Sequence, residues 1–332
     1  MHTNNINIIL PNRIGDSILT LPAIACLKQL LNKYGPENSK ITIFPAKVTA
    51  KIIQSFDLFP TKEINLLTKL KSWISPPDKV FFLYNSSQNL GYYAKTSYGC
   101  SSGKYKYSND LDYLIFNKTK ERLSNELVTF LQDKYQLSMA AISYFGICLD
   151  LGYSSEQILS TFEFNSDSLT PIKEFSNWQP PFINSKYMVI CMEAAYGKKV
   201  DANRRWPENN FLELADKIHK NFNIPCIFIG IDDKPSIPDK TYFIDLRKKL
   251  DITQVAQLLK YASGYIGNDS GPLHLANLIR KHSICIGLIP AAKTYEPIFK
   301  EFYHSIWNPE NADSIIPIIE EILSLDKDES IT

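Results

Sequence analysis

Two kinds of hydrophobic pattern alternate along this chain, and the alternation restricts it to few folds. Apolar runs of strand length occur three times in the first hundred residues, at 6–10, 41–44 and 80–84. After the first run, apolar residues recur at the helical spacing of three and four over about residues 16–31, at Leu19, Ala23, Leu27 and Leu30. Strands that alternate with helices predict a mainly parallel sheet covered on both faces, and therefore an α/β fold.

The alternation restarts in the second half of the chain. Residues 165–185 carry three prolines among polar residues and are typical of a linker. Beyond them, strand-like runs recur at 187–192, 226–230, 265–267 and 283–288. Helical patterns lie at 207–222, 252–261, 272–279 and 313–325. We therefore expect two doubly wound, Rossmann-like domains, residues 1–170 and 171–332, that face a cleft, with the last helix a candidate to pack back on the first domain.

The part of the first domain after residue 84 is less regular. Residues 85–110 are rich in Ser, Tyr, Asn and Gly, and we predict loops there. Two helical patterns follow, at 122–134 and 138–149.

Composition and charge exclude several classes of protein. The 36 basic and 35 acidic residues nearly cancel, so no global field attracts nucleic acid. No apolar run approaches the roughly 20 residues that cross a bilayer. The first run is interrupted by Asn7 and stopped by Pro11, unlike a secretion signal, so we expect a cytoplasmic protein. The six cysteines are scattered without metal-ligand spacing, so we expect structural thiols, no metal site and no cofactor.

The segment GNDSGPLHLA at residues 267–276 carries the most chemical information. A strand runs into it, Ser270 and Gly271 turn the chain, and Pro272 suits the first position of a helix. The free N–H groups of a helix start bind anions, and Gly271 lets a phosphate approach the backbone. His274 on the first turn would donate to a phosphate or ribose oxygen. In the alternative interpretation, Ser270 only caps the helix and His274 is a polar core residue.

The first strand-to-helix turn has the sequence PNRIGDSILTLP at residues 11–22. It lacks the three-glycine dinucleotide fingerprint, which argues against a dehydrogenase. It offers Gly15 at the turn and Asp16 at the expected helix start. Asp16 is either an N-cap residue that complements the helix dipole or a general base that opens toward the cleft, and spacing alone does not decide.

Other polar clusters also allow two interpretations. Arg204 and Arg205 precede a Trp-Pro helix start, where they either clamp a pyrophosphate or form a solvated basic turn. Asp232, just after Gly230, either holds ribose hydroxyls or belongs to a turn. Basic residues in the first domain suit a phosphorylated acceptor or a solvated face: Lys95, Lys104, Lys106, Lys118, Lys120 and Arg122.

Together, the motifs RIGDSILTLP, RRWP and GNDSGPLHLA resemble, in type and order, the signatures of glycosyltransferase family 9, which includes the lipopolysaccharide heptosyltransferases. The resemblance spans most of the chain. It implies the GT-B fold, a donor bound by the second domain and an acceptor bound by the first. It also implies an inverting, metal-independent reaction that typically uses ADP-heptose, at the cytoplasmic face of the inner membrane, which the protein would contact peripherally.

The resemblance also implies roles for individual residues. Asp16 would be the catalytic base, with Arg13, Gly15 and Lys104 on the acceptor side. Arg204 stands at the position of a phosphate-binding lysine, and Leu250 at that of an apolar residue that packs on adenine. The remaining donor-binding candidates are Arg205, Gly230, Asp232, Asp269, Ser270, Gly271 and His274.

One segment departs from the family pattern. Many relatives have Pro-Gly-Ala-Glu after the first strand of the second domain, whereas this chain has Met-Glu-Ala-Ala at residues 192–195. The Glu193 carboxylate would crowd or repel a phosphate, so a different sugar nucleotide stays open. Two further hypotheses are a protein or other glycan acceptor and a non-catalytic protein that binds sugar nucleotides.

Overall fold

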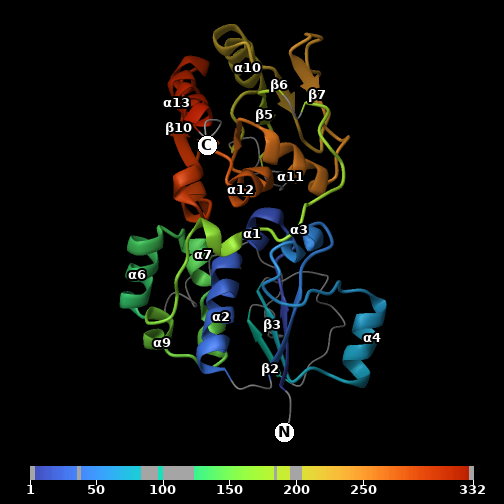
Figure 1. Ribbon diagram of the computed structural model, residues 1–332, viewed down its shortest axis with the longest axis vertical. Coiled ribbons are helices and arrows are strands. Elements are labelled where there is room, and N and C mark those ends of the chain that lie inside the picture. Colours follow the sequence, from blue (N-terminus) through green and yellow to red (C-terminus); the bar gives the residue numbers. More distant parts are fainter. Residues whose placement is uncertain are drawn as a thin grey trace. The chain divides into compact units, whose positions relative to one another are not determined.

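The computed structural model describes residues 4–35, 39–83, 96–99, 123–182, 185–194 and 204–328. The chain divides into two compact units, Met1–Lys173 (unit 1) and Glu174–Thr332 (unit 2). Each unit has its own parallel sheet with helices around it (Figure 1).

The sheet of unit 1 has four parallel strands in the order β2-β1-β3-β4. Their bounds are β1 Asn4–Ile9, β2 Ser39–Phe44, β3 Lys79–Phe82 and β4 Thr96–Gly99. The chain winds from β1 to β2 and then returns to β3 on the other side of β1. This reversal makes the carboxyl ends of β1 and β3 a switch point, where α/β proteins place ligands. The sequence prediction of loops at 85–110 is wrong at β4, since that short strand pairs with β3 through its main chain despite its polar sequence.

The helices of unit 1 enclose this sheet, with α2 and α4 on opposite sides of the strands (Figure 1). Two expected helices are each broken in two: α1 Ile14–Leu19 and α2 Leu21–Tyr34, and α7 Met139–Ser143 and α8 Gly146–Asp150. Pro22 explains the first break because it has no N–H to donate to the preceding turn. The other helices are α3 Ala50–Gln54, α4 Leu66–Ile74, α6 Asn125–Tyr135 and α9 Ser155–Leu159.

The run Ile14–Tyr34 is long and apolar enough to cross a membrane by composition alone. Its most apolar window is 67% buried, however, and α2 contacts α7, α8 and α9. This run therefore serves as a core helix of unit 1.

The sheet of unit 2 has six parallel strands in the order β10-β9-β8-β5-β6-β7. Their bounds are β5 Met188–Cys191, β6 Cys226–Phe228, β7 Phe243–Asp245, β8 Gly264–Asn268, β9 Ser283–Gly287 and β10 Tyr303–Trp307. If the six strands are numbered in chain order and read from β7 to β10, the order is 3-2-1-4-5-6, which is that of the doubly wound dinucleotide-binding fold. Its switch point lies between β5 and β8, which are neighbours in the sheet although far apart in sequence.

The helices of unit 2 are α10 Glu208–Phe222, α11 Ile252–Tyr261, α12 Gly271–Leu278 and α13 Ile316–Asp328. The start of α11, Asp251 with Gln254 three residues on, has the sequence pattern of a capping box, and the structure confirms it. Asp251 accepts from the Gln254 N–H, and the Gln254 side chain accepts from the Asp251 N–H. The last helix, α13, contacts α10 in its own unit, and its packing on the first domain stays a prediction.

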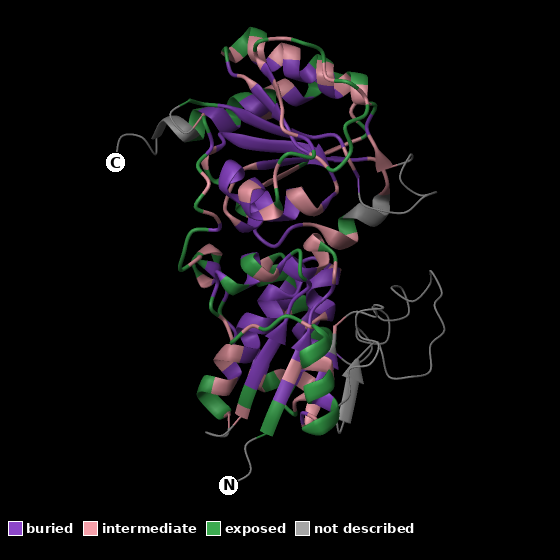
Figure 2. Cartoon of the chain, turned by 90° about the vertical axis from the view of Figure 1, so that its right-hand side faces the viewer, coloured by how far each residue is buried: buried purple, intermediate pink, exposed green. Residues whose placement is uncertain are grey.

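The core of unit 2 lies along its central strands. β5, β8 and β9 are buried along their whole length, as Figure 2 shows by colour. The five cysteines that the structure describes, Cys26, Cys148, Cys191, Cys226 and Cys285, are reduced and buried. Burial raises the pKa of Cys191 and of Cys285 to about 12, which makes them inert thiols at neutral pH.

Candidate functional site

The candidate site of unit 2 is organised around Asn268, the last residue of β8. This side chain is fully buried. Its Nδ2 donates to the Met192 carbonyl at 2.7 Å, and its Oδ1 accepts from the Trp206 N–H at 2.9 Å. The Asn268 side chain therefore connects the end of β8 to the end of β5 and to the segment that carries Arg204 and Arg205.

Arg204, Asp269 and His274 are brought together next to this joint. The Arg204 Nη2 donates to the Asp269 Oδ2. The His274 Nε2 lies 3.9 Å from the Asp269 Oδ1, too far for a hydrogen bond. The Arg204 Nε and the His274 Nδ1 are buried without a partner in the described part of the chain. Burying a polar nitrogen without a hydrogen-bond partner is costly, so these two groups suit a ligand that supplies a partner.

His274 is the strongly perturbed titratable group of this cluster. Burial lowers its pKa to about 4, against the opposing effect of the nearby Asp269 carboxylate, and the charge of Lys300 lowers it further. The imidazole is therefore neutral at pH 7 and carries one N–H. A neutral imidazole can donate one hydrogen bond to an anion and can accept a second one.

The start of α12 presents N–H groups that no side chain caps. Ser270 is the N-cap residue, but its side chain makes no capping hydrogen bond. Its hydroxyl lies 3.3 Å from the Tyr265 hydroxyl, at hydrogen-bond distance. The Tyr265 side chain reaches Ser270 across Gly267, where a Cβ would lie 2.3 Å from the Tyr265 hydroxyl oxygen. Ser270 is therefore the N-cap residue by position, as one of its two interpretations has it, although its side chain does not cap the helix. The helix begins at Gly271, one residue before the expected Pro272.

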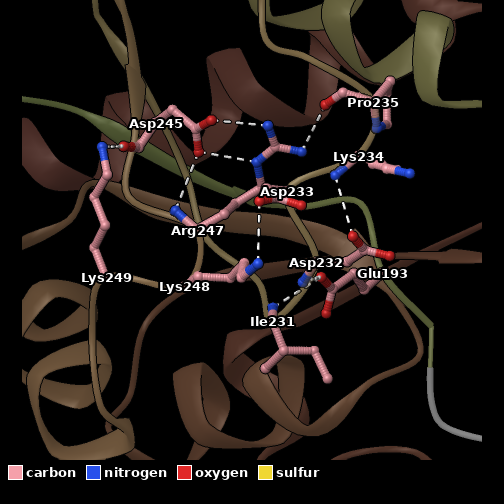
Figure 3. Close-up of polar contacts among 10 residues, drawn as sticks. All are labelled: Glu193, Ile231, Asp232, Asp233, Lys234, Pro235, Asp245, Arg247, Lys248 and Lys249. Carbon is pink, nitrogen blue, oxygen red and sulfur yellow. Dashed lines mark hydrogen bonds and ion pairs between the residues drawn. The ribbon is translucent and has the colours of Figure 1, made fainter.

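Glu193 is bound by the loop that follows β6. Its Oε1 accepts from the N–H groups of Ile231 and Asp232, at 2.8 and 2.6 Å, in the loop after β6 (Figure 3). A Cβ at Gly230 would lie 2.5 Å from the same oxygen, so the glycine allows this approach. The carboxylate is thus engaged by the loop. The structure gives Gly230 a packing role, and its predicted contact with a donor stays a prediction.

The loop after β6 is tied to the loop after β7 by a buried arginine that the sequence analysis missed. Arg247 donates to both carboxylate oxygens of Asp245, at 2.9 and 2.8 Å, and to the Pro235 carbonyl at 2.8 Å (Figure 3). The Asp-x-Arg spacing was a local signal for the ion pair. The carbonyl contact depends on tertiary structure.

Two other predicted donor residues lie on these same loops. The Asp232 side chain is exposed and accepts from the Lys234 N–H at 3.2 Å, so it forms the turn that was one of its two interpretations. Leu250 is half-buried just before α11. Their contacts with ribose and adenine stay predictions.

Lys300 and Glu296 form a further charged pair that the sequence analysis missed. The Lys300 Nζ lies 2.7 Å from the Glu296 Oε2. Burial lowers the pKa of Lys300, and its charge reaches His274. Both residues belong to the irregular segment after β9, which has no recognisable motif.

The acceptor-side candidates belong to unit 1, at the carboxyl end of β1. Arg13 is the N-cap residue of α1, and Asp16 lies in the first turn of that helix, half-buried. Asp16 is therefore not the N-cap, which was one of its two interpretations. The Ser17 hydroxyl donates to the Pro11 carbonyl at 2.5 Å and fixes the turn that holds Gly15 and Asp16. Lys104 lies outside the described residues.

The described ranges contain no cluster of metal-ligating side chains. No group of three or more His, Cys, Asp or Glu side chains is placed there to hold a metal ion. The polar groups that gather at the end of β8 are arginine, imidazole and backbone N–H.

Comparisons with known proteins agree with this architecture. The sequence model of "Glycosyltransferase family 9 (heptosyltransferase)" matches residues 106–288. No relative was found among curated proteins.

Solved structures with the same fold cover nearly the whole chain. The Escherichia coli heptosyltransferase WaaC with ADP is 14% identical, with a TM-score of 0.58, over 96% of this chain and 99% of that one. The E. coli ADP-heptose LPS heptosyltransferase II is 11% identical, with a TM-score of 0.64, over 97% of this chain and 99% of that one. A family 9 glycosyl transferase from Veillonella parvula is 15% identical, with a TM-score of 0.60, over 97% of this chain and 92% of that one. This likeness confirms the GT-B fold.

Proposed function

The chain belongs to glycosyltransferase family 9, and from this membership we propose that it transfers heptose from ADP-heptose to a lipopolysaccharide-core-type acceptor. The observation that carries the proposal is the cluster of hydrogen-bond donors at the end of β8. Arg204, His274 and the start of α12 gather there at the switch point, where doubly wound folds bind nucleotides. The acceptor would be a phosphorylated glycolipid at the cytoplasmic face of the inner membrane.

The donor cluster suits the charge that develops during transfer. The bond between the anomeric carbon and the β-phosphate oxygen breaks, and ADP leaves with the bonding electron pair. Negative charge therefore grows on the β-phosphate. Donors fixed in place before the reaction stabilise such charge most effectively. Arg204 and the uncapped N–H groups of α12 supply them, and His274 adds one neutral N–H.

Asp16 is the proposed base of unit 1. The acceptor hydroxyl oxygen attacks the anomeric carbon, and its proton passes to the Asp16 carboxylate. Attack from the side opposite the leaving ADP inverts the anomeric centre in a single displacement. General base catalysis of this kind contributes roughly 10²- to 10⁴-fold to the rate.

A second candidate function is transfer from a different nucleotide sugar. Glu193 favours it, because this carboxylate engages the N–H groups of Ile231 and Asp232 at the end of β6. A negative charge fixed on that loop changes which ribose or base fits beside it. The same enzyme class would then use another donor, or a protein or other glycan as acceptor.

The test is an ADP-release assay with ADP-heptose, heptose-free lipopolysaccharide as acceptor, and a metal chelator. Wild-type protein is expected to release ADP only when the acceptor is present. Asp16→Asn keeps the size of the side chain but removes the base, so turnover should fall at least about 10²-fold while the affinity for ADP stays the same. Normal turnover of Asp16→Asn would contradict the assignment. ADP binding without any turnover would indicate a non-catalytic protein.

A further inference from the structure

Helix α4 (Leu66–Ile74) exposes its apolar side chains and buries a polar one. The exposed fractions are 73% for Leu66, 66% for Leu67, 51% for Leu70, 66% for Trp73 and 85% for Ile74. Ser72 on the same helix is only 3% exposed. Figure 2 views the molecule from the side on which Figure 1 places α4, and the helix there is mostly in the colour of exposed residues. Surface helices of globular proteins have the opposite orientation.

The exposed apolar side chains form one continuous stripe. At 3.6 residues per turn, they all fall within about one third of the helix circumference. Thr68 and Ser72 lie on the opposite side, which faces the unit. Lys69 and Lys71 lie on the two borders of the stripe. The helix is thus amphipathic, with its apolar stripe outward and a lysine along each border.

Local hydrogen bonds fix the start of this helix. The Thr68 N–H donates to the Asn65 Oδ1 at 2.9 Å, and the Asn65 N–H donates to the Thr68 Oγ1 at 2.7 Å. This capping box fixes the helix start without any contribution from the apolar stripe. The stripe is therefore formed before any partner arrives.

The charges around the stripe identify the partner. α4 contains no acidic residue, and residues 61–79 carry four lysines against Glu63 and Asp78. The Asp78 Oδ2 accepts from the Asn5 N–H at 2.9 Å and so faces β1. A second copy of the chain on this stripe would bring lysines against lysines. An anionic lipid surface attracts the lysines, and tryptophan favours the interface between headgroups and acyl chains.

We propose that α4 lies in the headgroup region of an anionic lipid bilayer and holds unit 1 at the membrane surface. The apolar stripe enters the boundary between headgroups and acyl chains, and the bordering lysines contact anionic headgroups. The inference concerns unit 1 alone and does not depend on the donor site of unit 2.

Vesicle flotation of the full chain tests the proposal. The vesicles contain either phosphatidylcholine alone or equal parts of phosphatidylcholine and phosphatidylglycerol. Leu70→Ser with Trp73→Ser removes apolar surface from the stripe, and Lys69→Glu with Lys71→Glu reverses its charge. Ile172→Ser is the matched control, because Ile172 is 67% exposed in the same unit but lies outside α4. Unchanged thermal unfolding and ADP affinity show that each variant is folded.

The wild type and Ile172→Ser are expected to float with the phosphatidylglycerol vesicles and to detach in high salt. Each α4 double variant should bind these vesicles at least about tenfold more weakly. Three results would overturn the proposal: a wild type that does not float, α4 variants that float as well as the wild type, or an equal loss in Ile172→Ser. A concentration-dependent dimer that the Leu70/Trp73 variant abolishes, without vesicle binding, would assign the stripe to self-association instead.

Discussion

Replacing His274 by glutamine should remove a pH-dependent part of the stability of unit 2. Burial depresses the pKa of this imidazole from 6.5 to about 4. Between these two values the unfolded chain binds a proton that the folded chain does not bind. The stability of the wild type therefore falls as the pH falls below about 6.5, and the loss is complete below about pH 4.

The size of this effect follows from the two pKa values. Each unit of pKa shift corresponds to about 1.4 kcal/mol, so the complete loss is about 3 kcal/mol. Between about pH 7.5 and pH 5, the loss amounts to about 2 kcal/mol. Glutamine does not titrate, so this contribution is missing from His274→Gln. The variant has its own cost from altered packing, but that cost is the same at both pH values.

The assay is urea unfolding of the wild type and His274→Gln at about pH 7.5 and pH 5. The difference in unfolding free energy between the two proteins should change by about 2 kcal/mol between the two conditions, in favour of the variant at low pH. Saturating ADP should shrink this change, because a bound phosphate favours the protonated imidazole. A difference that is identical at both pH values would refute the reasoning.

Substitutions at Asn268 and Glu193, each with a matched control, test the joints that position the site. Asn268→Leu leaves the Trp206 N–H and the Met192 carbonyl unpaired and should cost about 2–4 kcal/mol in urea unfolding. It should also weaken ADP binding. Asn277→Leu is the matched control: it breaks an equivalent pair of bonds, to Phe299, so it should be similarly destabilised but bind ADP more nearly normally. Glu193→Ala should lower the unfolding free energy by about 1 kcal/mol, because two loop N–H groups lose their acceptor. Glu193→Gln keeps an acceptor oxygen, so its unfolding free energy should stay within about 0.5 kcal/mol of the wild-type value. Equal destabilisation by Ala and Gln would show that the charge, and not the acceptor, holds the loop.

The elements that the sequence predicted well are those whose signals are local. The β8–α12 turn combines a buried strand, a Ser-Gly-Pro turn and a helical pattern within fifteen residues of the chain. The capping box of α11 is likewise complete within four residues. Edge strands gave weaker signals. β10 lies at the edge of its sheet, is only partly buried and mixes polar with apolar residues, so it lacks a continuous apolar run.

The parts of the site that the sequence did not reveal depend on contacts between distant segments. The bond from Asn268 to Met192 spans 76 residues and exists only because β5 and β8 are neighbours in the sheet. Glu193 could be recognised as a departure from the family pattern, but its contacts with the loop after β6 required the tertiary fold. Periodicity likewise shows that α4 has an apolar stripe and cannot show that the stripe faces outward.

The central claim is that the end of β8 and the start of α12 bind the diphosphate of an adenine nucleotide donor. Calorimetric titration with ADP, UDP, GDP and CDP, without added metal, tests it most directly. The account predicts selective binding of ADP, which Arg204→Ala weakens at least about tenfold through the loss of a charged hydrogen-bond donor. Undiminished ADP binding by Arg204→Ala, or no binding of any of the four nucleotides by the wild type, would contradict it.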